Sequence, residues 1–112
     1  MNKIIDISTK ITNELPMIRI SDTQIYSVNN RKNTILNMQA MIQEEERKAK
    51  QEDGTFDEMK LMDKALKMLV GAKAAKEIEA MDLPFPEYKI VYQAIMAAAT
   101  GTDMEEVESR FQ

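Results

Sequence analysis

The spacing of apolar residues has a strand-like period near the N-terminus and a helical period through most of the chain. The segments MIRI and QIYSV, on either side of Asp22 and Thr23, are rich in β-branched and aromatic residues. They predict a β-hairpin over residues 17–28, with a two-residue turn that places Ile20 opposite Ile25 on one face. Because an isolated hairpin is marginal in water, it must pack on helices or pair with another strand.

The first fifteen residues have two overlapping patterns. Ile5 and Ile7 alternate as in a strand, whereas four apolar residues recur at helical spacing, namely Ile4, Ile7, Ile11 and Leu15. The longer pattern favours a short helix over residues 1–15, which ends before Pro16.

A long helix is expected after Asn29 and Asn30, both of which are good helix N-caps. Its apolar stripe consists of Ile35, Met38, Ile42 and Ala49. The helix then runs into EEERKAKQED, where Glu44–Lys48 and Glu46–Lys50 are i,i+4 pairs in the favourable order. Such a run is typical of a solvated helix end rather than of an acidic metal or catalytic site.

The next helix opens at Thr55, which forms a capping box with Glu58. Its apolar residues cover roughly 200° of the helix surface, against about 100° for an ordinary surface helix. They are Met59, Met62, Leu66, Leu69 and Val70, flanked by Leu61, Ala65 and Met68. This helix therefore has more apolar surface than one neighbour needs.

The C-terminal part continues in helix formers past Gly71, which ends or interrupts the preceding helix, as far as Met81. The sequence LPFP is a rigid break, and Pro86 suits the first position of a new helix that is apolar on nearly all sides. Gly101 is a natural residue to follow that helix, and Thr102 with Glu105 predicts a last short one.

Together these patterns predict a mainly α (α+β) fold with about five helices and one small N-terminal hairpin. The chain of 112 residues has the size of a single domain. Within that domain, residues 1–50 form a hairpin-containing part and residues 55–112 a helical part.

Composition argues against several functional classes. The chain contains neither histidine nor cysteine, so the commonest general base, metal ligand and thiol nucleophile are missing, and we expect no enzyme, metal or cofactor. A net charge of −4 without a basic cluster argues against nucleic-acid binding. The longest uncharged stretch falls short of the roughly 18 apolar residues of a membrane span. Zero cysteine fits a reducing cytoplasm.

The sequence has ten methionines, and thioether side chains suit surfaces that repack around varied partners. Any single methionine is more often a core residue. For the methionines taken together, we expect that some of them contribute to a partner-binding surface on the helix that begins at Thr55. The predicted partner-binding residues form one face of Met59, Met62, Leu66 and Leu69 and a flank of Leu61, Ala65 and Met68. We expect the flank to be less needed for the core.

Three segments resemble the tail assembly chaperones of long-tailed phages and prophages of Gram-positive bacteria. They are PMIRISDTQIYSVNNRKNTILNMQAMI, QEDGTFDE and LPFPEYKIVYQAIMAAATGTDMEEVESRF. The resemblance implies a non-enzymatic protein of the bacterial host cytoplasm that coats the tape measure protein until tail tube subunits polymerise. It also implies self-association, and an exposed hairpin edge independently predicts a weak homo-oligomer.

Two other functions fit the same residues. One is a small phage or mobile-element protein that binds and inhibits a bacterial host protein, and the other is a minor tail structural subunit. A gene position between tail tube and tape measure genes would favour the chaperone. Presence in the finished virion would favour the structural subunit.

Overall fold

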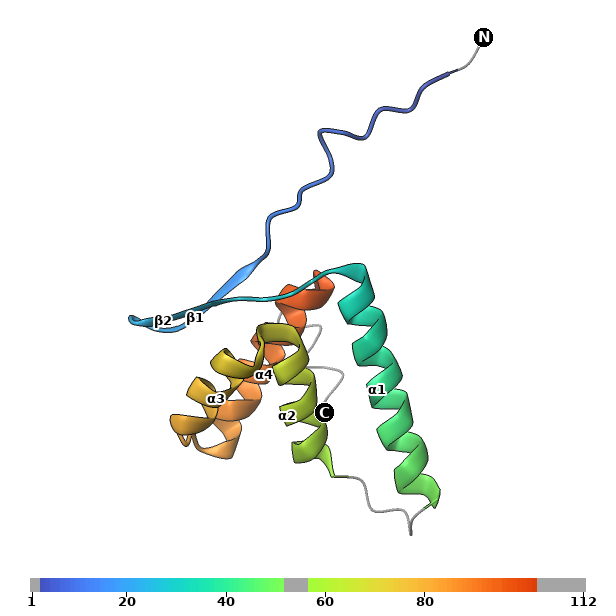
Figure 1. The fold of residues 1–112 in the computed structure, drawn as a ribbon. Helices are drawn as coiled ribbons and strands as arrows, with labels where there is room; N and C mark the ends of the chain where they lie inside the picture. The colour runs from blue at the N-terminus through green and yellow to red at the C-terminus, as the bar shows by residue number, and fades with distance from the viewer. Residues whose placement is uncertain (1–2, 52–56, 103–112) are drawn as a thin grey trace.

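The protein is mainly helical, as predicted. A computed structural model describes residues 3–51 and 57–102, and in these residues four helices follow a two-stranded antiparallel hairpin (Figure 1). The elements in chain order are β1 (Met17–Ser21), β2 (Gln24–Ser27), α1 (Lys32–Gln51), α2 (Glu58–Val70), α3 (Ala72–Ala80) and α4 (Phe85–Thr100). The last short helix, predicted from Thr102 and Glu105, lies almost wholly outside the described residues. None of the described helices is long and apolar enough to cross a membrane.

The hairpin forms where the sequence predicts it, with the turn at Asp22 and Thr23. The predicted pairing of Ile20 with Ile25 is wrong, because Ile25 lies opposite Arg19 and the register shifts between Arg19 and Ser21. Ile20 is the extra residue of this β-bulge, and a bulge turns neighbouring side chains relative to the partner strand. Ile20 is half-buried, whereas Ile25 is exposed.

Residues 3–16 do not form the predicted helix. They form an irregular arm that extends away from the helices, and all of residues 3–15 are exposed (Figure 1). A helix of this length is marginal in water unless its apolar face packs on something, and here the isoleucines find no neighbour. Near the base of the arm, the Arg31 guanidinium donates a hydrogen bond to the backbone carbonyl oxygen of Asn13 at 3.2 Å.

The core lies where α2, α3, α4 and the hairpin meet. β1 packs against α4, and the chain leaving β2 is joined to the end of α2 by the hydrogen bond from Asn29 N to Leu69 O, at 2.7 Å. The core residues are Val28, Met38, Met62, Ala65, Leu66, Leu69, Ile78, Val91, Tyr92, Ile95 and Ala99. The buried character predicted for α4 is therefore confirmed along one face, while Ile90 on the same helix is exposed.

The helix ends follow from local chemistry. α2 begins at Glu58 rather than at Thr55, because the Asp57 carboxylate caps it by accepting a hydrogen bond from Lys60 N at 3.0 Å. Thr55 itself lies outside the described residues. Gly71, with φ +90° and ψ 164°, lies between the end of α2 and the start of α3. Of the two predicted possibilities, that Gly71 ends the helix or only interrupts it, the first is correct. α4 begins one residue before Pro86.

Candidate functional site

Most of the predicted partner-binding residues lie in the core. Leu61, Met62, Ala65, Leu66 and Leu69 are buried, and Met68 is half-buried. The expectation that the flank is spared from the core is wrong for Leu61, which is 7% exposed, and for Ala65, which is 0% exposed. Only Met59, 42% exposed, offers much of its side chain to a partner.

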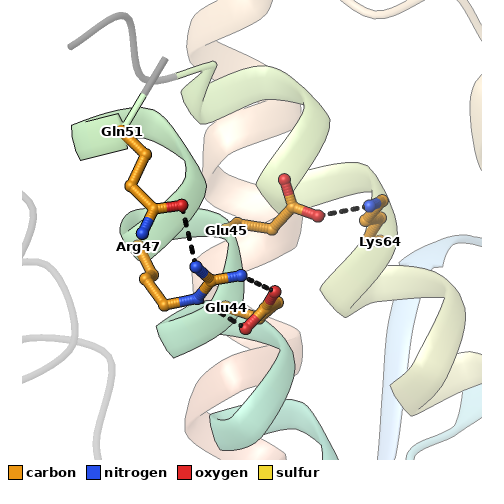
Figure 2. Close-up of polar contacts among 5 residues, drawn as sticks. All are labelled: Glu44, Glu45, Arg47, Gln51 and Lys64. Carbon is orange, nitrogen blue, oxygen red and sulfur yellow. Dashed lines mark hydrogen bonds and ion pairs between the residues drawn. The ribbon is translucent and has the colours of Figure 1, made fainter. Parts of the chain in front are cut away.

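The flank of α2 is buried because α1 lies along it (Figure 1). Lys64 is a near neighbour of Leu61 and Met68 on the helix surface, so these residues share a face. Figure 2 shows Lys64 of α2 reaching across to Glu45 of α1, with 2.5 Å between Nζ and Oε1. The apolar arc of α2 is therefore wide because it has to cover α1 on one side and the core on the other.

A second group of charges runs along α1 alone. The Arg47 guanidinium donates to both carboxylate oxygens of Glu44, at 2.5 and 3.1 Å, and to the Gln51 side-chain oxygen at 2.9 Å (Figure 2). The sequence pairs Glu44 with Lys48, but the hydrogen-bonded partner in the structure is Arg47, one turn away. Glu44, Arg47, Lys48 and Lys50 are all exposed, so this end of α1 is a solvated helix end, as the sequence indicates. Exposed pairs of this kind add little stability.

The Glu45–Lys64 pair gives the α1–α2 contact a dependence on pH. The hydrogen bond from Lys64 lowers the pKa of Glu45 from its ordinary value of 4.5. A lowered folded-state pKa means that the stabilisation is present above pH 4.5 and is lost as the pH falls through the folded-state pKa. We expect Glu45→Gln to lower the Tm slightly at pH 7, and we expect this deficit to shrink at about pH 3, as the Glu45 carboxylate takes up a proton and the ion pair is lost.

Thermal unfolding followed by circular dichroism at both pH values measures this effect. Glu46→Gln is the matched control, because Glu46 is exposed on the same helix. A deficit of the Glu45→Gln variant that persists unchanged at pH 3 would contradict the assigned ion pair.

Met59 lies at the edge of a hollow where α2, the end of α3 and the start of α4 meet. We call this hollow, of about 250 Å³, the Met59 groove. Its apolar lining consists of Met59, Ile78, Leu83 and Phe85, and its polar lining of Asp63, Glu79, Asp82 and Tyr88. Ile78 is fully buried at its base, whereas Phe85, like Met59, is nearly half exposed. The groove is an apolar depression with charged edges.

Tyr88 and Asp63 join two sides of the groove, because the Tyr88 hydroxyl of α4 donates a hydrogen bond to the Asp63 carboxylate of α2. Burial is the main reason that the pKa of Tyr88 is raised far above its ordinary value of 10.0, and the Asp63 hydrogen bond and the charges of Asp63 and Glu79 add to it. The hydroxyl therefore stays neutral at physiological pH. It acts as a fixed donor that positions α4 against α2.

A second hollow, of about 500 Å³, lies between the hairpin and the junction of α2 and α3. Met17, Ile25, Val70 and Ala74 contribute its apolar lining. The Tyr26 hydroxyl donates to the Glu77 carboxylate at 2.8 Å and ties the hairpin to α3 at this point. Burial and this hydrogen bond raise the pKa of Tyr26.

Sequence reasoning missed Leu83 and Phe85, because LPFP was interpreted only as a break between helices. The available signal was a large aromatic residue between two prolines. Proline fixes the backbone, so the Phe85 side chain is held at the start of α4 while remaining 46% exposed. Met59 and Phe85 thus come together at the Met59 groove from positions 26 residues apart in the chain.

The described residues contain no group of three or more acidic, histidine or cysteine side chains placed to hold a metal ion. Comparison of the chain with protein-family models, curated proteins and solved structures finds no match.

Proposed function

We propose that this chain is a non-enzymatic tail assembly chaperone of a phage or prophage. In this role it binds apolar helical segments of the tape measure protein in the bacterial host cytoplasm and keeps that protein soluble until the tail tube polymerises. The observation that carries the proposal is the Met59 groove, an apolar depression edged by the half-exposed side chains of Met59 and Phe85.

The groove suits repeated, weak capture of many similar segments. A partly exposed methionine adapts its shape to different apolar side chains, so one groove accepts several sequences. A shallow hollow of about 250 Å³ buries little area in each contact, so single contacts are weak. Weak contacts are required of a chaperone that must later yield the tape measure protein to tail tube subunits.

Two further features fit this role. The net charge of −4 would keep a coated complex soluble through mutual repulsion. The arm and the hairpin edge, with Ile4 at 86% exposure and Met17 also exposed, offer surfaces for weak association between copies along a long partner.

The proposal predicts that replacing the two exposed apolar side chains abolishes the chaperone effect. We expect Met59→Gln with Phe85→Gln to fold with an unchanged Tm, because both side chains already face solvent in part. The same variant should return a co-expressed tape measure protein from the same phage or prophage to the insoluble fraction. The measurement is the soluble share of that protein after lysis and centrifugation.

The matched control is Leu36→Gln with Ile90→Gln, two apolar residues outside the groove that are slightly more exposed, at 51% and 55%. This control should keep the partner soluble. If the Met59→Gln, Phe85→Gln variant folds and still keeps the tape measure protein soluble, the proposed site is wrong. If the wild-type chain never solubilises the partner, the function is wrong.

A further inference from the structure

Among the described residues, the charged side chains that line the Met59 groove are all acidic, and Lys67 and Lys76 belong to a neighbouring hollow that Asp63 and Glu79 also line. Three carboxylates line it, from Asp63, Glu79 and Asp82, and no lysine or arginine belongs to the lining that the structure describes. Asp82 N donates a hydrogen bond to the Glu79 carbonyl oxygen at 3.1 Å. This bond closes a turn at the end of α3 and keeps the two acidic residues close together. The raised pKa of Tyr88, to which the charges of Asp63 and Glu79 contribute, agrees with a negative potential inside the groove.

The apolar part of the groove has room for one large side chain. Ile78, fully buried, forms its base, and Met59 and Phe85 stand at its edge. An enclosed apolar cavity of about 150 Å³ accepts a benzene ring, so the open Met59 groove, of about 250 Å³ including its polar side, is large enough for a leucine or phenylalanine side chain. The three carboxylates are the charged side chains that line the groove around such an apolar anchor.

We propose that the Met59 groove binds helical segments in which one large apolar side chain is flanked by lysine or arginine. The proposal rests on the proposed function and specifies the chemistry of the partner segment. Basic residues beside the apolar anchor are attracted by the carboxylates of the groove, which speeds association and selects among partners. A segment with acidic residues beside its anchor would be repelled by the same carboxylates.

The rival occupant is the arm of a second copy of this chain, where Lys10 precedes Ile11. Charge complementarity favours the external segment, because Asp6 and Glu14 cancel the charges of Lys3 and Lys10 within the described arm. A basic segment without acidic residues matches the groove better.

The test uses the purified full chain and two fluorescent helical peptides with identical apolar positions, one flanked by lysines and the other by glutamates. We expect the lysine peptide to bind about tenfold more tightly by fluorescence anisotropy at low salt, since each exposed charge pair contributes only a small factor. Glu79→Gln with Asp82→Asn should reduce that preference to about threefold or less. Asparagine suits position 82, where φ is +48°.

Two further variants separate charge from apolar contact. Glu14→Gln with Glu46→Gln, which removes two exposed carboxylates outside the groove, should leave the tenfold preference unchanged. Met59→Gln should weaken both peptides by the same factor, because it removes apolar contact and no charge. High salt should weaken the lysine peptide selectively.

Equal binding of the two peptides, or an unchanged preference in the Glu79→Gln, Asp82→Asn variant, would overturn the proposal. So would sedimentation showing a peptide-free dimer that this variant abolishes, because the occupant would then be a second copy. Lysine-peptide selectivity without solubilisation of a tape measure protein would support the groove and reject the proposed function. Solubilisation of a tape measure protein without a preference for the lysine peptide would support the proposed function and reject the proposed basic partner segment.

Discussion

Replacing Leu66 with alanine is expected to lower the free energy of unfolding by about 2–5 kcal/mol. Leu66 is 2% exposed and packs in the core of buried residues. The shorter side chain removes apolar contacts and leaves a cavity that the surrounding helices fill only in part. Since a domain of this size has a total stability of about 5–15 kcal/mol, the loss is a large fraction of it.

Urea denaturation followed by circular dichroism measures the change through the midpoint. Leu36→Ala is the matched control, because Leu36 is 51% exposed on α1, and we expect a loss of about 0.5 kcal/mol or less. This comparison decides between two assignments of Leu66, as a core residue or as part of a free partner-binding face. A cost below about 1 kcal/mol would favour the free face and contradict the packing.

The second large effect is expected at the junction of α2 and α3. Gly71 has φ +90° and ψ 164°, a region that essentially only glycine occupies, so Gly71→Ala should cost about 1–3 kcal/mol. A Cβ built at this position meets no atom within 4 Å beyond the adjacent residues of the chain, so the cost comes from backbone strain and not from a clash. Straining this junction loosens α3 from α2, with a lower Tm as the result.

Gly101→Ala provides the comparison. Gly101 ends α4 in the left-handed helical region, at φ +73° and ψ 15°, where a Cβ also meets no atom within 4 Å. A non-glycine residue in the left-handed region costs about 1–2 kcal/mol, against about 1–3 kcal/mol in the region of Gly71, so we expect the smaller loss in Tm at Gly101. Equal effects at both glycines would contradict the assigned backbone conformation of Gly71.

The position of the hairpin and of the four described helices followed from local signals. Strand-forming residues on both sides of Asp22 and Thr23 defined the hairpin, and helical spacing with Gly101 at its end defined α4. These signals act over a few residues, through turn preferences and side-chain periodicity, and can therefore be recognised in a sequence. Local signals failed where a competing residue changed the outcome. Asp57 capped α2 in place of Thr55, and the bulge at Ile20 shifted the register.

The arm shows where periodicity is insufficient. Its isoleucines have helical spacing, but a short helix is stable only when its apolar face is buried. Whether anything covers Ile4 or Ile11 depends on where the rest of the chain lies, and in the structure both remain exposed.

The sequence by itself determined the helical class, the hairpin and the wide apolar arc of α2. Tertiary structure alone decided how that arc is used, because periodicity shows that a face is apolar but not which neighbour covers it. α1 and the core cover Leu61 and Ala65, Met68 and Val70 are half-buried, and Met59, at 42%, is the most exposed residue of the arc. The Met59 groove was likewise set by packing, because it joins Met59, Ile78 and Phe85 from three helices, and no local pattern links positions so far apart.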